Sequence, residues 1–279
     1  MAIKITSDST CDLTHELLER YQVSVMPLSV SLGDNTYKDG ESIVPADIFK
    51  YVSETGQLPT TAATNIGEYM EFFGPLAEQY DAVIHINLGS GFSSCHQNAK
   101  LAAAEFDNVY AVDSCNLSSG QGLVVIEAAL AAQRGEKAED IVAMLNELTG
   151  RVDTSFVVDK LDYLAKGGRC SSAVALGANL LKLKPCINLE HGKMDVGKKY
   201  RGVWAKLLPG YARERLEGKD ICKDRVFITY TSCPPEVVDE LRELLKAEGF
   251  GEILENVAGS TITSHCGPNT LGVLFIRNK

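Results

Sequence analysis

The 279-residue sequence contains no apolar run long enough to cross a membrane as a helix. A spanning helix needs about 20 consecutive apolar residues, whereas the richest stretch here, residues 122–132, carries Glu127. The first residues alternate in polarity and lack the basic, apolar and cleavage regions that make up a signal peptide. We therefore expect a cytoplasmic protein with no stable insertion in a membrane.

Positive charge is scarce. The chain has 27 lysines and arginines against 37 acidic residues, which gives a net charge of −10. An acidic protein is repelled by nucleic acid and by anionic membrane surfaces unless it carries a dedicated basic patch. We expect no nucleic-acid partner.

The eight cysteines form no C-x-x-C pair. We expect reduced, mostly buried thiols that behave as small hydrophobic groups. Two adjacent pairs, Cys95-His96 and His265-Cys266, could supply metal ligands. Neighbouring residues rarely bind one metal, and the spacing fits no zinc pattern. We expect no metal site, and a thiol or metal sensor built on these four residues remains an alternative.

Several catalytic and cofactor signatures are missing. No G-x-S-x-G segment is present, the segment after residue 88 lacks the third glycine of a dinucleotide fingerprint, and no G-K-[ST] follows it. We expect no cofactor. A hydrolase or acyltransferase with Ser93 as nucleophile and His265 as base remains an alternative, although the sequence offers no acidic partner for it.

The pattern that is present predicts an α/β fold. In the first half, expected strands (residues 2–7, 23–32, 81–88 and 109–112) alternate with expected helices (13–21, 46–54, 66–79 and 94–106). Such alternation is typical of a mostly parallel sheet covered by helices. Beyond residue 150, helices mix with an expected hairpin at 186–196, and a helix is expected at 173–181. We predict two domains, an α/β domain at 1–150 and an α+β domain at 151–279.

The junction between the strand at 81–88 and the following helix is the most informative segment. It reads Gly89-Ser90-Gly91-Phe92-Ser93-Ser94. Backbone N–H groups and hydroxyls at a helix N-terminus suit a small anion such as a carboxylate or phosphate. The alternative is an ordinary helix cap at Ser93 or Ser94. His265 is expected in a loop before the last strand, either reaching a cleft between the domains or simply exposed.

Several polar and glycine-containing segments are spread along the whole chain. They are Ser7–Leu13, Tyr37–Gly40, Pro59–Thr61, Val112–Ser114 with Ser119–Gly122, Lys166–Arg169 and His265–Pro268. In order and spacing they resemble the bacterial DegV family. The resemblance implies two α/β domains, the first a Rossmann-like three-layer sandwich with helices on both faces of its sheet. It also implies a long-chain fatty acid held between and within the domains. Family members that work as FakB present that acid to a separate kinase, which converts the carboxylate to an acyl phosphate.

The resemblance assigns roles by position. Thr61, Ser93 and His265 match the groups that bind the fatty-acid carboxylate. The expected supporting loop residues are Gly91, Ser94, Ser119 and Gly120. Arg169, with Lys166 and Arg201, is expected at the pocket mouth or in partner docking, and a solvated surface cluster is the alternative for these cations.

The implied protein is no enzyme by itself but the substrate-binding subunit of a two-component fatty acid kinase. Its expected ligand is of the palmitate, stearate or oleate type. Burial of each CH₂ group contributes about 0.8 kcal/mol, so a tail of roughly 16 carbons represents on the order of 10 kcal/mol and favours an enclosed pocket.

Overall fold

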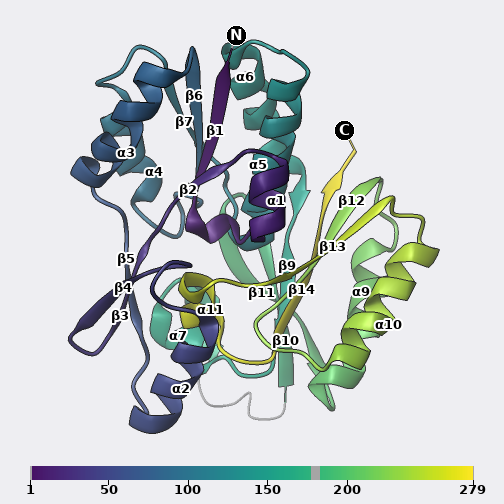
Figure 1. The fold of residues 1–279 in the computed structure, drawn as a ribbon. Coiled ribbons are helices and arrows are strands. Elements are labelled where there is room, and N and C mark those ends of the chain that lie inside the picture. Colours follow the sequence, from purple (N-terminus) through teal and green to yellow (C-terminus); the bar gives the residue numbers. More distant parts are fainter. Residues whose placement is uncertain (1, 177–182, 279) are drawn as a thin grey trace.

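The first half of the chain forms a parallel sheet. The computed structural model describes residues 2–176 and 183–278 (Figure 1). The sheet has the strand order β2-β1-β6-β7, and every pairing in it is parallel. Its strands are β1 (Ile3–Asp8), β2 (Ser24–Met26), β6 (Ala82–Asn87) and β7 (Val109–Asp113). All residues of β6 are buried, as expected for a strand covered on both faces.

Helices cover both faces of this sheet, which confirms the predicted arrangement (Figure 1). On one face lie α3 (Ile66–Gln79) and α4 (Cys95–Ala103). On the other lie α1 (His15–Arg20), α5 (Ser118–Gln133) and α6 (Ala138–Leu148). Helix α5 is buried almost all round because it also packs against the sheet of the second half, through β12 and β14.

A small antiparallel sheet, order β4-β3-β5, extends from the first half and carries α2 (Pro45–Thr55). Its strands are β3 (Ser29–Leu32), β4 (Asn35–Lys38) and β5 (Thr60–Ala62). The prediction of one strand over residues 23–32 was wrong, because β2 and β3 belong to different sheets. Pro27 has no N–H for a ladder, and the N–H of Leu28 is taken by Ser9 Oγ at 3.1 Å.

The second half forms a seven-stranded mixed sheet, order β11-β10-β9-β14-β12-β13, with β8 also paired to β14. Its strands are β8 (Val152–Asp153), β9 (Ser155–Val158), β10 (Leu183–Glu190), β11 (Lys193–Arg201), β12 (Ile221–Tyr230), β13 (Glu252–Val257) and β14 (Thr270–Arg277). The predicted hairpin at 186–196 is confirmed as part of β10 and β11. Its two turn residues, His191 and Gly192, both have positive φ, as a tight hairpin turn requires.

Helices flank this second sheet on both sides. One face is covered by α9 (Trp204–Leu216) and α10 (Pro235–Ala247), and the other faces α5 and α11 (Ser260–Cys266). Two short helices, α7 (Asp162–Gly167) and α8 (Ser171–Leu176), follow β9. The predicted helix at 173–181 overlaps α8 at its start, and its remainder lies outside the described residues.

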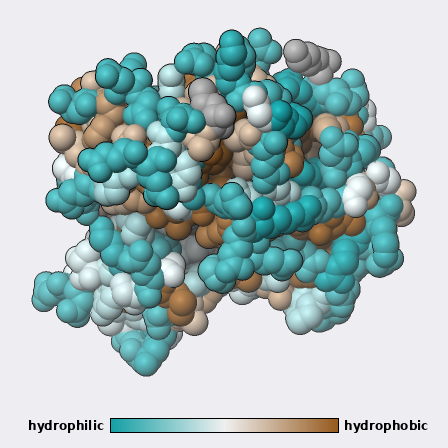
Figure 2. All heavy atoms as spheres, turned by 45° about the horizontal axis from the view of Figure 1, so that its top comes forward, coloured by the Kyte–Doolittle hydropathy of each residue, from teal (hydrophilic) through white to brown (hydrophobic). Residues whose placement is uncertain are grey.

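Short 3-10 turns occur at Ser9–Cys11 (η1) and Thr149–Arg151 (η2). The predicted domain boundary near residue 150 falls in η2 and remains a prediction, because one apolar cluster contains Leu123 and Ile84 of the first half together with Phe227 and Leu274 of the second. On the face drawn in Figure 2, hydrophilic residues cover most of the surface and hydrophobic side chains gather in a band across the middle.

Candidate functional site

A partly enclosed cavity of about 190 Å³ lies where the small sheet, the turn between β6 and α4, and α11 meet. Its polar lining consists of Thr61, Ser93, Ser94, Thr261, Arg169 and His265. Its apolar lining includes Leu28, Leu88, Phe92, Leu117, Met194 and Ile262. The structure therefore brings the three predicted carboxylate-binding side chains to one cavity.

Two of these side chains are hydrogen-bonded across a separation of 204 residues. Thr61 lies in β5 and its Oγ1 is 2.8 Å from Nε2 of His265. The expectation that His265 occupies a loop was wrong, because it lies in the last turn of α11. The segment Thr-Ile-Thr-Ser has weak helix propensity, so its helical state depends on tertiary packing. Gly267 ends the helix at a positive φ of 71°.

The electrostatic environment keeps the His265 imidazole neutral. Burial lowers its pKa to about 4, and the Arg169 guanidinium adds to the shift. The ring nitrogen Nδ1 is buried and has no hydrogen-bond partner among the described residues. It lies against Gly167, where an added Cβ would come within 2.6 Å of it. A neutral imidazole offers one N–H donor and one acceptor nitrogen at this site.

Ser93 lies in the turn that joins β6 to α4. Its Oγ accepts the N–H of Cys95 at 3.3 Å and donates to Cys95 Sγ at 3.1 Å. Ser93 therefore binds a backbone N–H at the start of α4, as a helix cap does, and its side chain also lines the cavity. The backbones of Gly89 and Asn116 pack so closely that residue 89 must be glycine, since a Cβ there would be 2.9 Å from the backbone nitrogen of Asn116.

The predicted mouth residues are all exposed but differ in position. Arg169 lines the cavity, and its guanidinium donates to the carbonyl of Gly167 at 2.7 Å. Lys166 lies at the end of α7 and Arg201 at the end of β11, and neither belongs to the cavity lining. Gly91 lies outside the lining as well, where it touches the carbonyl of Gly192 in the β10–β11 turn.

The predicted supporting role of Ser119 and Gly120 needs correction. Both residues lie in the first turn of α5 and not in a loop, and neither lines the cavity. Ser119 Oγ accepts from Thr229 Oγ1 at 2.6 Å and from Asn256 Nδ2 at 3.1 Å. These residues join α5 to the sheet of the second half.

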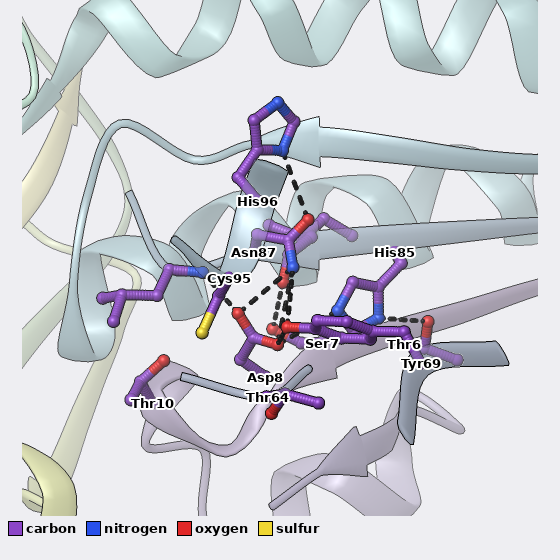
Figure 3. Close-up of polar contacts among 12 residues, drawn as sticks. Thr6, Ser7, Asp8, Thr10, Thr64, Tyr69, His85, Asn87, Cys95 and His96 are labelled. Carbon is purple, nitrogen blue, oxygen red and sulfur yellow. Dashed lines mark hydrogen bonds and ion pairs between the residues drawn. The ribbon is translucent and has the colours of Figure 1, made fainter. Parts of the chain in front are cut away.

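A buried carboxylate that sequence reasoning did not single out, that of Asp8, is hydrogen-bonded to residues just before this turn (Figure 3). Asp8, at the end of β1, is fully buried. It accepts from Tyr69 Oη at 2.6 Å, from His85 Nε2 at 3.1 Å and from the N–H of Leu88 at 2.8 Å. Asn87 Nδ2 adds a contact at 3.2 Å. Since a buried charge needs several donors, this network fixes the residue that precedes Gly89.

Two further carboxylates hold the N-terminus of α11. Asp12 Oδ1 accepts the N–H of Gly259 at 3.0 Å, and Asp39 Oδ1 accepts the N–H of Ser260 at 2.8 Å. Burial raises the pKa of Asp12 well above its usual range, and the nearby Asp39 carboxylate adds to the shift. Residue 259 must be small, because a Cβ there would lie 2.8 Å from Asp12 Oδ1. Loops of the first half thereby position the helix that carries His265.

The apolar end of the cavity leads toward the large sheet. A smaller cavity of about 30 Å³ shares Leu117, Ile262 and Cys266 with the first. The hydroxyls around it bond to the protein itself, as Thr231 does to the carbonyl of Gly267 at 2.6 Å and Thr270 to that of Cys266 at 3.1 Å. The space between α11 and the sheet is therefore lined mainly by apolar atoms.

The geometry does not favour the two alternatives. His265 Nε2 bonds to Thr61 and Ser93 Oγ to Cys95, so the serine and histidine do not form the hydrogen bond of a nucleophile and its base. Burial raises the pKa of the Cys95 thiol to about 11 and of the Cys266 thiol to about 12. Within residues 2–176 and 183–278, no group of three or more His, Cys, Asp or Glu side chains is arranged to hold a metal.

The parallel sheet, the mixed sheet and the cavity lined by polar and apolar side chains define an α/β protein with a candidate site at the junction of its sheets. No helix in the described part of the chain has the length and apolar character needed to span a membrane. The sequence model described as "Uncharacterised protein, DegV family" matches residues 2–278. The chain belongs to the DegV family.

Relatives match over nearly the full length. A DegV domain-containing protein of Caldanaerobacter subterraneus subsp. tengcongensis is 32% identical over 276 residues, which cover 98% of each chain. A solved DegV family protein from Thermus thermophilus, described as binding fatty acid, is 33% identical with a TM-score of 0.89 and 100% coverage of both chains. DegV from Bacillus subtilis, described as a fatty acid binding protein, is 29% identical with a TM-score of 0.84 and 100% coverage of both chains.

Proposed function

We propose that this protein binds a long-chain fatty acid, with the carboxylate at Thr61, Ser93 and His265 and the tail in the apolar part of the cavity. The observation that carries the proposal is the Thr61–His265 hydrogen bond in a cavity that is lined by both polar and apolar side chains. The fatty-acid binding described for the relatives from Thermus thermophilus and Bacillus subtilis supports it.

The head group would be held by neutral donors. When the neutral His265 donates its Nε2 hydrogen to Thr61 Oγ1, the hydrogen of the Thr61 hydroxyl is free to point at a carboxylate oxygen. The Ser93 hydroxyl can turn from Cys95 Sγ to the second oxygen, because a carboxylate is a far stronger acceptor than a thiol. Arg169 adds positive potential at the mouth.

The tail would be held by burial alone. The Leu28, Phe92, Met194 and Ile262 side chains surround its first carbons, and the smaller cavity continues along α11 toward the large sheet. At about 0.8 kcal/mol for each CH₂ group, chain length dominates the affinity. We propose an acid of the palmitate, stearate or oleate type as the ligand.

We further propose that the protein presents the head group to a separate kinase. The carboxylate would lie beside exposed Arg169, with Lys166 and Arg201 as further exposed cations for a partner or for its ATP. In the reaction of the partner, a carboxylate oxygen attacks the γ-phosphorus of ATP, and ADP leaves. The protein itself would supply no catalytic group and would act in the cytoplasm as the substrate-binding subunit.

Lipid extraction followed by mass spectrometry tests the binding step. Purified protein should yield a stoichiometric long-chain acid, and delipidated protein should take up added stearate or oleate. Thr61→Ala and Ser93→Ala should each weaken binding about 10- to 150-fold, as expected for one lost hydrogen bond to a charged group. Thr36→Ala, which removes an exposed hydroxyl of β4, is the control. Folded protein that is empty and takes up no acid would refute the proposal.

The kinase step has its own test. Loaded protein, the kinase subunit of a fatty acid kinase and ATP should give an acyl phosphate that hydroxylamine traps as a hydroxamate. Lys166→Gln or Arg201→Gln should raise the KM for the loaded protein without changing fatty-acid affinity, because neither side chain lines the cavity. Lys246→Gln on α10 removes the same charge from an exposed site and should leave the KM unchanged. Equal turnover by all variants would contradict the docking role.

A further inference from the structure

A separate cavity of about 720 Å³ lies between η2, the β10–β11 turn and the end of α9. The side chains that matter for its chemistry are Arg215, Lys219, Arg277, Asn116, Asn146 and Asn188. Its volume is within the roughly 300–1,000 Å³ typical of small-molecule sites. We call it the basic cavity, after Arg215, Lys219 and Arg277.

The three cations of the basic cavity share one carboxylate. Asp153 bonds to Arg215 through one oxygen, and its Oδ2 lies 2.8 Å from Lys219 Nζ and 3.8 Å from Arg277 Nε. The Asp153 side chain is 8% exposed, so these interactions are only partly screened by water. Glu190 also lines the cavity, but its side chain is exposed. Positive charge thus collects at one place in a chain whose net charge is −10.

The cations are partly desolvated. The side chains of Arg215 and Lys219 are 19% and 25% exposed. Burial lowers the pKa of Lys219, and the charges of Arg215 and Arg277 lower it further, while Asp153 opposes the shift. Arg277 differs, because its side chain is 47% exposed and its guanidinium also donates to the carbonyl of Gly150 at 3.1 Å. Oδ2 of Asp153 already contacts both Lys219 and Arg277, and a second anion bound to these two cations from the cavity side would reduce their repulsion further.

If the cluster served only to neutralise Asp153, two cations would be enough. Arg215 and Lys219 already satisfy both oxygens of Asp153, and Arg277 adds only a long contact. With Asp153 and Glu190 counted, the three cations leave an excess of one positive charge, which a phosphate group complements, and guanidinium groups suit its oxygens. The exposed Asn146 amide in the lining can bond to the rest of a polar molecule, whereas the side chains of Asn116 and Asn188 already bond within the protein.

We propose that the basic cavity binds a small phosphorylated molecule, with its phosphate between Lys219 and Arg277. This site uses none of the residues assigned to the fatty-acid site, so the proposal stands whether or not the protein binds fatty acid. The recess favours a free small molecule over the head group of a lipid in a bilayer.

Calorimetric titration with inorganic pyrophosphate tests the proposal on the full chain as purified. Wild type should bind saturably, and Lys219→Gln and Arg277→Gln should each weaken binding at least about 10-fold. Lys246→Gln, at a side chain 69% exposed, removes the same charge elsewhere and should change affinity less than about twofold. Near-ultraviolet circular dichroism checks folding. Arg277→Gln keeps the test decisive if Lys219→Gln is unfolded, because Arg277 is half exposed.

Three results would overturn the proposal. One is no saturable pyrophosphate binding up to about 5 mM, well above the range of specific sites. Another is an equal loss of affinity in Lys246→Gln, which would mean diffuse electrostatic attraction. The third is binding to phosphatidic acid vesicles that depends on Lys219 and Arg277 while pyrophosphate does not bind, which would assign the cations to a lipid surface.

Discussion

At the residue scale, the buried His265 predicts a specific pH dependence. Its pKa is lowered from about 6.5 to about 4 by burial, so between these values the unfolded chain binds a proton that the folded chain does not. Stability from this group is therefore complete above pH 6.5 and is lost as the pH falls toward 4. By pH 5 the loss should be on the order of 2 kcal/mol. Urea unfolding of wild type and His265→Gln at pH 7 and 5 measures it, and equal losses in both proteins would contradict the assignment.

Gly167 offers a second residue-scale prediction. An added Cβ would meet His265 Nδ1 at 2.6 Å, so Gly167→Ala should push the imidazole away from Thr61. We expect at least about 10-fold weaker fatty-acid binding, the cost of about one charge-assisted hydrogen bond. Gly74→Ala in α3 is a matched control, because a Cβ there meets nothing within 4 Å. Unchanged affinity in Gly167→Ala would show that the Thr61–His265 bond is dispensable.

Residue types in the sequence pointed to part of the site. Hydroxyls at strand ends and a histidine before the last strand could be picked out, and the structure brings Thr61 and His265 into contact. The role of Asp8 could not be seen in the same way. It depends on the register that sets β1 beside β6, which places Leu88 and His85 around the carboxylate.

At the element scale, α11 should depend on its two capping carboxylates. Asp39→Ala removes the acceptor of the Ser260 N–H and should lower the free energy of unfolding by about 1–2 kcal/mol. It should also weaken fatty-acid binding, because α11 carries His265. Asp39→Asn keeps an oxygen acceptor without the charge and should lie between wild type and Asp39→Ala.

The control for this prediction is another capping carboxylate. Asp47 accepts the N–H of Val44 at the start of α2 at 3.0 Å and has no contact with the cavity lining. Asp47→Ala should lower stability by about 1 kcal/mol and leave fatty-acid affinity unchanged. If Asp47→Ala and Asp39→Ala weaken fatty-acid binding equally, the effect belongs to global stability and not to the position of α11.

Some helices and strands could be predicted from the sequence and others could not, and the difference has a physical cause. Strongly apolar or periodic segments such as β6 and α3 were identified because their pattern alone determines them. The break at Pro27 and the helix at Ser260–Cys266 were missed. Both depend on partners from elsewhere in the chain, Ser9 for the first and the carboxylates of Asp12 and Asp39 for the second.

At the scale of the whole molecule, α5 explains how the two sheets form one structure. Alternating strands and helices predicted the parallel sheet, whereas the strand order of the large sheet rests on long-range pairings that no local pattern contains. The sequence of residues 118–133 gives no sign of a second sheet, yet α5 packs against both sheets. Its small residues allow this contact, since a Cβ on Gly120 would overlap Thr154 Oγ1 and Asn116 Oδ1.

This shared helix predicts that the chain unfolds in one cooperative step. The apolar cluster around α5 contains residues of both sheets, so neither half can lose its packing alone. Differential scanning calorimetry should give one transition, and Gly120→Ala should lower its Tm by several degrees, as about 1–3 kcal/mol of overpacking strain requires. Gly150→Ala, where a Cβ meets nothing within 4 Å, should leave the Tm nearly unchanged. Two separate transitions, with Gly120→Ala shifting one of them, would mean that the halves fold independently and that the predicted boundary near residue 150 is a thermodynamic one.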